Sequence, residues 1–317
     1  MRSTADAPPD APLAGADDSP FHLTLREAFA ELSAGRPDSA LNIYRQAWAT
    51  VKFDSLPLRR DEAQVGIAAA LIELGKPLEA ERGLRQILLS ASSTRLRWYT
   101  AYQLSRICTE KSETERAIFF AYRCLALAQG LQIASFLVAS HNRIANLLIF
   151  QSDFAHARQH YEKALAHIPP GSQEPFYEAV KTALYDNLGY CMVVLGEALD
   201  GLVFLHRAER RARQGGASHL LPEIAQDLAY GYLHVGDLGQ ARVRAMQALE
   251  AAETQKNLRV EKNVLVVLCQ IHLALKERDG LYQGYLARLS RHFPGVPDLE
   301  RLMREFDFVD AINFRAQ

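Results

Sequence analysis

The sequence predicts an all-α protein, a superhelical solenoid of about seven helix-turn-helix repeats closed by a capping helix. Three observations support this fold class. From Phe21 onward, helical patterns alternate with short breaks, and apolar–polar alternation typical of strands is missing except at the extreme C-terminus. Two linked columns of small residues recur along the chain, and a turn-forming residue stands between them in six of seven copies.

The first column places one small residue in each copy, with neighbouring members 37, 40 or 44 positions apart: Ala28, Ala68, Ser105, Ala145, Gly189, Ala229 and Cys269. The second column follows twelve positions later and is small in all copies but the last: Ala40, Ala80, Ala117, Ala157, Gly201, Ala241 and Leu281. Two antiparallel helices approach closely only where the side chains at their crossing are small. The columns therefore predict where the two helices of each hairpin cross.

A turn residue stands five positions before the second column: Gly35, Gly75, Ser112, Ser152, Gly196 and Gly236. Glycine ends a helix in the left-handed conformation at little steric cost. The seventh copy has Lys276 there and departs from the pattern. A large aliphatic residue precedes the first column in the other copies, whereas the first copy has Glu27.

These repeats resemble the tetratricopeptide repeat (TPR) family. The best matching stretches are 141–170, 186–208 and 227–249, with Tyr44 and Tyr161 at the family's aromatic position in the second helix and Pro169 at its closing proline. The period, near 40 residues, is longer than the usual ~34, as in kinesin light chains and the sensory arms of bacterial regulators. The resemblance implies a right-handed superhelix over residues 21–290 in seven repeats, with the first helix of each repeat lining the concave face.

The two ends differ from the repeats. Residues 1–20 are rich in Pro, Ala, Asp and Ser, and we expect a disordered leader. Residues 291–317 contain a short helix that Asp298 can cap and an apolar tail with Phe308, Val309, Ile312 and Phe314. We interpret this region as a cap over the last repeat, which a solenoid needs; a docking or self-association element is the alternative. The longest spacing, at 169–171, predicts a longer loop, or alternatively a hinge.

Composition limits the function classes. The formal net charge is −1, from 36 basic and 37 acidic residues, which argues against a nucleic-acid binder. The sequence has no apolar run of membrane-spanning length and no signal-peptide core, so we expect a cytoplasmic protein without membrane contact. The four cysteines are far apart in apolar helical patterns, and we expect them to be small buried hydrophobes.

The resemblance places the binding site on the concave face, at positions three before, two before and one after the first column. Amide, tyrosine, arginine and aspartate side chains dominate there, and these groups can clamp a peptide backbone, supply contact area or pair with charges. The candidate partner-binding residues are Tyr99, Tyr102, Gln103, Arg106, Asn142, Arg143, Asn146, Asp186, Asn187, Tyr190, Gln226, Asp227, Tyr230 and His234. The alternative is that these positions are merely solvated, or that the tyrosines pack between helices.

Catalysis and metal binding have little support. His156 and His160 share a helix face but have no evident third ligand, and the basic stretch 206–213 is typical of the solvated end of a helix. No catalytic or phosphate-binding motif stands out. We expect no enzyme, no cofactor and no metal.

The predicted function is a non-enzymatic adaptor or scaffold that binds a partner protein's peptide or helix in the concave groove. The alternative is a bacterial-type regulator whose groove senses a peptide or small ligand, with the tail or leader occupying the groove at rest. Apolar inward residues in the end repeats, such as Leu25 and Val266, also fit homodimerisation through an end repeat or the tail.

Overall fold

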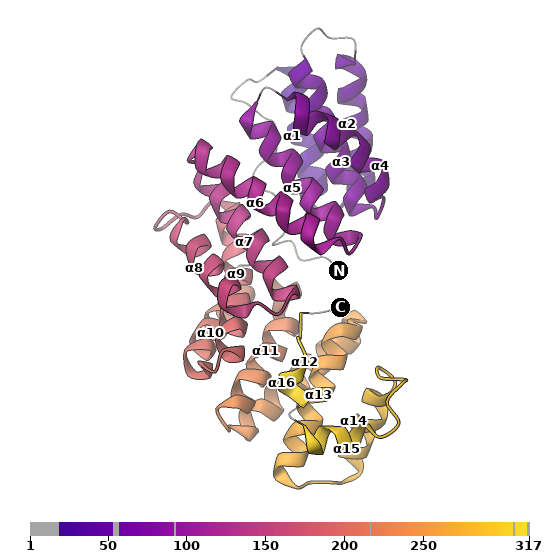
Figure 1. Ribbon diagram of the computed structural model, residues 1–317, viewed down its shortest axis with the longest axis vertical. Helices are drawn as coiled ribbons and strands as arrows, with labels where there is room; N and C mark the ends of the chain where they lie inside the picture. The colour runs from indigo at the N-terminus through magenta and orange to yellow at the C-terminus, as the bar shows by residue number, and fades with distance from the viewer. Residues whose placement is uncertain (1–18, 53–56, 92, 216, 307, 316–317) are drawn as a thin grey trace.

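The computed structural model describes residues 19–52, 57–91, 93–215, 217–306 and 308–315. The predicted leader lies almost entirely outside this range. The described residues form an all-α repeat solenoid without strands, in which seven antiparallel helix pairs stack in a curved row (Figure 1). The pairs are α1 (Pro20–Ser33) with α2 (Pro37–Val51), α3 (Pro57–Glu73) with α4 (Pro77–Ser90), α5 (Thr94–Glu110) with α6 (Thr114–Leu131), α7 (Ala134–Phe150) with α8 (Phe154–Ala166), α9 (Pro175–Val194) with α10 (Ala198–Gln214), α11 (Leu221–His234) with α12 (Leu238–Gln255), and α13 (Leu258–Leu275) with α14 (Gly280–Ser290).

The small-residue columns lie where the paired helices cross, as predicted. In the fifth pair, a Cβ atom on Gly189 would lie 2.8 Å from the carbonyl oxygen of Gly201, and one on Gly201 would lie 2.7 Å from that of Gly189. In the third pair, the Ser105 hydroxyl donates to the Ala117 carbonyl across the crossing, at 2.9 Å. The last pair departs, because Leu281 is exposed.

The turn within each pair has a left-handed residue at the predicted position. Glycine holds this position in four pairs, with φ between +72° and +84°. Ser112, Ser152 and Lys276 adopt the same conformation, with φ of 57°, 59° and 58°. Lys276 therefore keeps the turn of the repeat although its residue type breaks the pattern.

Helix starts follow ordinary capping chemistry. The carboxylates of Asp153, Asp237 and Asp279 accept hydrogen bonds from backbone N–H groups in the first turns of α8, α12 and α14. Proline begins α2, α4 and α9, where its missing N–H costs nothing.

The apolar interior divides into two clusters that meet in α9. One cluster runs from α1 to α9, and the other runs from α9 to the C-terminal helices α15 (Leu299–Glu305) and α16 (Phe308–Ala311). Leu299 and Met303 of α15 are buried in the second cluster together with Tyr282 and Leu289 of α14. The C-terminal helices thus extend the core beyond the last pair.

Two further expectations concern the interior and the membrane. All four cysteines are free and buried, as predicted, and burial raises the pKa of the Cys191 thiol to about 12. Among the described helices, none combines the length and the apolar character needed to cross a bilayer.

Candidate functional site

The C-terminal segment (residues 308–315) lies across the first helices of four successive pairs. After α16 it runs along the inner side of the curved row, where Figure 1 shows it in yellow beside α11 and α13. Its polar contacts reach the end of α7, then α9, α11 and α13. We call the surface under it the groove floor, which these four helices form.

Arg315 is the most strongly bonded residue of the segment. Its Nη2 atom lies 2.8 Å from Oδ2 of Asp186 and 2.5 Å from Oδ2 of Asp227, and its Nε donates to Oδ1 of Asn187 at 3.2 Å. The guanidinium carbon also lies 4.9 Å from the centre of the Tyr190 ring. Arg315, whose side chain is 11% exposed, is therefore paired with two carboxylates and covered by an aromatic face.

Phe314 fills an aromatic cage. Its ring is fully buried and lies against Tyr190 and Tyr230, with ring centroids 6.2 Å and 4.9 Å away. Its backbone N–H donates to the Tyr190 hydroxyl at 2.9 Å, and its carbonyl accepts from Asn263 Nδ2 at 2.9 Å and from Arg259 Nη1 at 2.8 Å. Both backbone polar groups of Phe314 are thus satisfied by side chains of the groove floor.

The rest of the segment is anchored at two points. Asn313 Nδ2 donates to the carbonyl of Ile149 at 2.6 Å and to the Ser152 hydroxyl at 3.2 Å. Asp310 accepts from the Tyr230 hydroxyl at 2.9 Å and lies 2.9 Å from His234 Nε2. Ile149 belongs to the first apolar cluster, so the segment is bonded to both halves of the solenoid.

The groove floor under Arg315 is acidic. Burial, and then the neighbouring charge of Asp227, raise the pKa of Asp186 well above its ordinary value. Burial also raises the pKa of Asp227, although Arg315 opposes that effect. Burial alone would lower the pKa of Arg315, but the two aspartates outweigh it and hold that pKa above its usual range. Arg315 thus favours the charged form of each aspartate, but burial outweighs it, so the pKa of both carboxyl groups stays raised.

The structure brings six of the predicted partner-binding residues together under the segment: Asp186, Asn187, Tyr190, Asp227, Tyr230 and His234. Two more support them from the side. The Gln226 amide donates to Asp227 at 2.7 Å and its oxygen accepts from Asn263 at 3.0 Å, and Asn146 accepts from Asn187 at 3.4 Å. The later repeats thus carry one continuous set of contacts to the segment.

The remaining predicted residues lie inside the earlier repeats. Tyr99, Tyr102 and Gln103 are fully buried, and Asn142 is 1% exposed. Arg143, 3% exposed, donates to the hydroxyl and the carbonyl of Ser105, both at 3.0 Å. Arg106 pairs with Glu73 of α3. The two arginines connect neighbouring pairs.

Several residues of the site were not among the candidates. Asn263 and Arg259 of α13 hold the Phe314 carbonyl, and Glu223 pairs with Arg259 at 2.7 Å. Asn263 lies three positions before Val266, so it shares the inner face of α13 with an apolar residue. That spacing could have identified Asn263, whereas the residues of the segment carried only their unusual apolarity as a signal.

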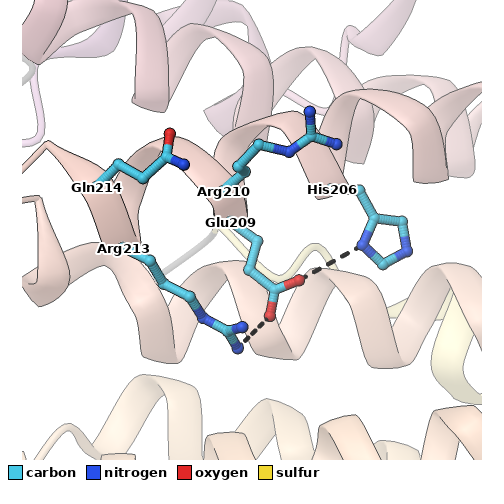
Figure 2. Close-up of a pocket in the computed structure, with 5 residues that line it drawn as sticks. All are labelled: His206, Glu209, Arg210, Arg213 and Gln214. Carbon is cyan, nitrogen blue, oxygen red and sulfur yellow. Dashed lines mark hydrogen bonds and ion pairs between the residues drawn. The ribbon is translucent and has the colours of Figure 1, made fainter.

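A separate pocket of about 420 Å³ lies along α10 (Figure 2), and it is lined by His206, Glu209, Arg210, Arg213 and Gln214. Glu209 is already paired with Arg213 and with Arg244 of α12, both at 2.6 Å. His206 Nε2 lies 2.8 Å from the Tyr232 hydroxyl. The main charges of this pocket are thus bound within the protein, unlike those of a site that awaits a ligand.

The histidines of α8 point to different partners. His156 is exposed and pairs with Asp153, while His160 is buried with its Nδ1 atom 3.0 Å from Nδ1 of His141. Burial lowers the pKa of His141 to about 3 and that of His160 to about 4, so this pair stays neutral at physiological pH. Within the described part of the chain, no group of three or more His, Cys, Asp or Glu side chains could hold a metal ion.

Comparison with known proteins finds similarity at the level of the fold. No protein-family model matches the chain, and no curated protein sequence matches it. Solved structures of similar fold include the following three. A signal-transduction ATPase with numerous domains and a tetratricopeptide-repeat sensor, from Pyrococcus horikoshii, aligns with a TM-score of 0.67 at 14% identity over 92% of this chain and 44% of that one. This chain therefore spans less than half of the Pyrococcus protein.

The other two structures are Rap proteins. RapI in its apo form aligns with a TM-score of 0.66 at 12% identity, over 88% of this chain and 77% of that one. A Rap protein complexed with Competence and Sporulation Factor aligns with a TM-score of 0.60 at 14% identity, over 86% and 74%. With the repeat columns and the left-handed turns, these likenesses establish that the chain has the tetratricopeptide-repeat solenoid fold.

Proposed function

We propose that the chain is a non-enzymatic protein-interaction adaptor that binds a peptide segment of a partner protein on the groove floor. The observation that carries the proposal is the position of the C-terminal segment, whose backbone and side chains form hydrogen bonds with four helices. A surface that binds one peptide segment through side-chain amides, tyrosines and carboxylates has the chemistry to bind another. The fold neighbours support the proposal, since one is described as a sensor and one is complexed with a factor.

The test is a selection of random peptides displayed on phage, on the full chain carrying Phe314→Ala and Arg315→Ala. These two changes remove the ring contacts of Phe314 and the side-chain bonds of Arg315, and we expect them to open the groove floor. Peptides should be enriched on this opened protein and much less on the wild type, which blocks its own groove.

Two aromatic substitutions in the opened protein locate the binding. Tyr230→Ala, in the groove floor, should abolish it, whereas Phe119→Ala, an exposed residue of α6, should leave it intact. Circular dichroism checks that both variants stay helical. Failure to enrich any peptide, or peptides that Tyr230→Ala retains, would contradict the proposal.

A second candidate function is a regulator in which ligand binding changes the curvature of the solenoid. It is favoured by one observation: the segment is bonded to residues of both apolar clusters, through Asn313 to Ile149 of the first and through Asp310 to Tyr230 of the second. Release of the segment would then free the two halves to move. Small-angle scattering of the opened protein and the wild type distinguishes the two candidates, because a rigid adaptor keeps its radius of gyration and a regulator does not.

A further inference from the structure

We propose that the groove floor selects an aromatic residue followed directly by arginine in the peptide of its partner, and that Phe314 and Arg315 are an internal copy of that ligand. The inference rests on the proposed function and specifies its ligand. It predicts which peptides bind, and in which order their residues must stand.

The arginine subsite distinguishes arginine from lysine. It offers carboxylate oxygens of Asp186 and Asp227 and the amide oxygen of Asn187, with the face of Tyr190 above them. A planar guanidinium can donate in several directions and stack on the ring at once. A lysine ammonium has no plane to stack and is a compact point charge, so it cannot reproduce this set.

The charge of the subsite requires a cation. Asp186, Asp227 and Glu223 face Arg259 and Arg315, so removal of Arg315 leaves three acidic side chains with one guanidinium. The Asp186 side chain is 8% exposed and that of Asp227 is fully buried. Oδ1 of Asp186 is buried without a hydrogen-bond partner among the described residues. A site with unbalanced buried carboxylates is unstable when empty and favours a ligand that supplies the missing charge.

The aromatic subsite adds shape. Phe314 is fully buried between Tyr190 and Tyr230, in geometries that aromatic rings adopt with one another. The Tyr230 hydroxyl is bonded to Asp310 and that of Tyr190 to the Phe314 N–H. An aliphatic side chain would leave part of this cage unfilled.

Order is set by the backbone contacts. The N–H of Phe314 reaches Tyr190, and its carbonyl reaches Asn263 and Arg259 on the opposite side. These bonds fix the chain direction, so the residue after the aromatic one reaches the carboxylates. A peptide with arginine before the aromatic residue cannot satisfy both subsites in the same backbone register.

The experiment measures fluorescence anisotropy with a labelled peptide of residues 308–315. The peptide is amidated, so that no terminal carboxylate lies beside Asp186 and Asp227. The protein is the full chain with Phe314→Ala and Arg315→Ala. Each of three altered probes carries one change. The first has lysine in place of Arg315, the second has leucine in place of Phe314, and the third has Phe314 and Arg315 in reversed order.

The original probe should bind the opened protein at least tenfold more tightly than each altered probe, and more tightly than it binds the wild type. Adding Asp186→Asn and Asp227→Asn should erase the preference for arginine over lysine while keeping that for phenylalanine over leucine. If the double change at positions 314 and 315 impairs folding, Asn313→Ala serves as the milder opening. It removes the side-chain contacts to Ile149 and Ser152 and the bond from the Arg315 N–H.

Equal affinity for all four probes would overturn the inference and leave the proposed function standing. The same holds if the probes fail to bind while the phage selection yields groove-binding peptides of another kind. Failure of both the probes and the selection would overturn the proposed function itself.

Discussion

The inner faces of the early and late repeats carry similar side chains but use them differently. In α5 and α7, the inward arginines and tyrosines are buried against the neighbouring pair, as Arg143 is against Ser105. In α9 and α11, the inward aspartates and tyrosines are bonded to a segment that arrives from far along the chain. The same positions of the repeat therefore stabilise the solenoid in one half and hold the C-terminal segment in the other.

The largest effect should come from the early half. Arg143→Met removes a buried guanidinium that bonds the Ser105 hydroxyl and carbonyl and the Thr109 hydroxyl. We expect the free energy of unfolding to fall by about 2 to 4 kcal/mol, because buried partners of a charged donor lose their bonds. Chemical denaturation of the variant and the wild type measures this difference.

The control is Arg123→Met, the same change at an exposed position of α6. A loss no greater than in this control would mean that Arg143 does not hold α7 to α5, and the contrast between the halves would disappear.

Substitutions in the segment should have smaller effects that do not add. Phenylalanine to alanine in a rigid core costs about 3 to 5 kcal/mol, but the loss at Phe314 cannot exceed the free energy with which the segment docks. We therefore expect Phe314→Ala, Arg315→Ala and the double variant to lose nearly the same amount.

Chemical denaturation of all three variants measures these losses. In addition, the rate of amide hydrogen exchange at the Phe314 N–H should rise in Arg315→Ala and in Asn313→Ala. Fully additive losses would show that the segment is a permanent part of the core, and the late half would then resemble the early one.

The sequence predicted the repeats well because local rules set them. The small columns mark crossings such as Gly189 with Gly201, and the turn position is left-handed in all seven pairs, even at Lys276. It was harder to predict which groups an inward-facing side chain contacts. Whether Arg143 reaches a ligand or a neighbouring helix depends on the distance between repeats, which the residue type does not encode. The bond from Asn313 to Ile149 joins residues 164 positions apart, and no local pattern specifies such a contact.

The pH dependence of the free energy of unfolding should reveal the buried acidic pair of the late half. Burial and the charge of Asp227 raise the pKa of Asp186 well above 3.8, its ordinary value. A carboxyl whose folded-state pKa is raised contributes stability below its unfolded pKa and loses it as the pH rises through the folded value. Compared with Asp186→Asn, the wild type should therefore lose stability as the pH rises from 4 toward 8.

Denaturation of the two proteins across that range measures the difference, with Asp200→Asn, an exposed aspartate of α10, as the control for charge. A difference that stays constant with pH, or that grows in favour of the wild type, would contradict the buried acidic pair.

The smallest effect concerns the turns. Lys276 ends α13 with φ of 58°, a conformation that glycine adopts without a Cβ penalty. Lys276→Gly should stabilise the protein by about 0.5 to 1 kcal/mol. Gln151→Gly changes a helix end with φ of −86°, where glycine relieves no strain. It should instead destabilise the protein slightly, because glycine raises the conformational entropy of the unfolded chain. Thermal unfolding of both variants tests the opposite signs.

The tether of the segment has a quantitative consequence for any partner. Only two residues separate α15 from α16, so the segment searches a small volume and its local concentration is in the millimolar range, as for short linkers. An external peptide with the same intrinsic affinity competes with that concentration, and its apparent affinity falls by the fraction of time that the groove stands open. Under the proposed function, the tether sets a threshold: a partner must be abundant, bind more tightly than the segment, or engage a second surface before it can occupy the groove.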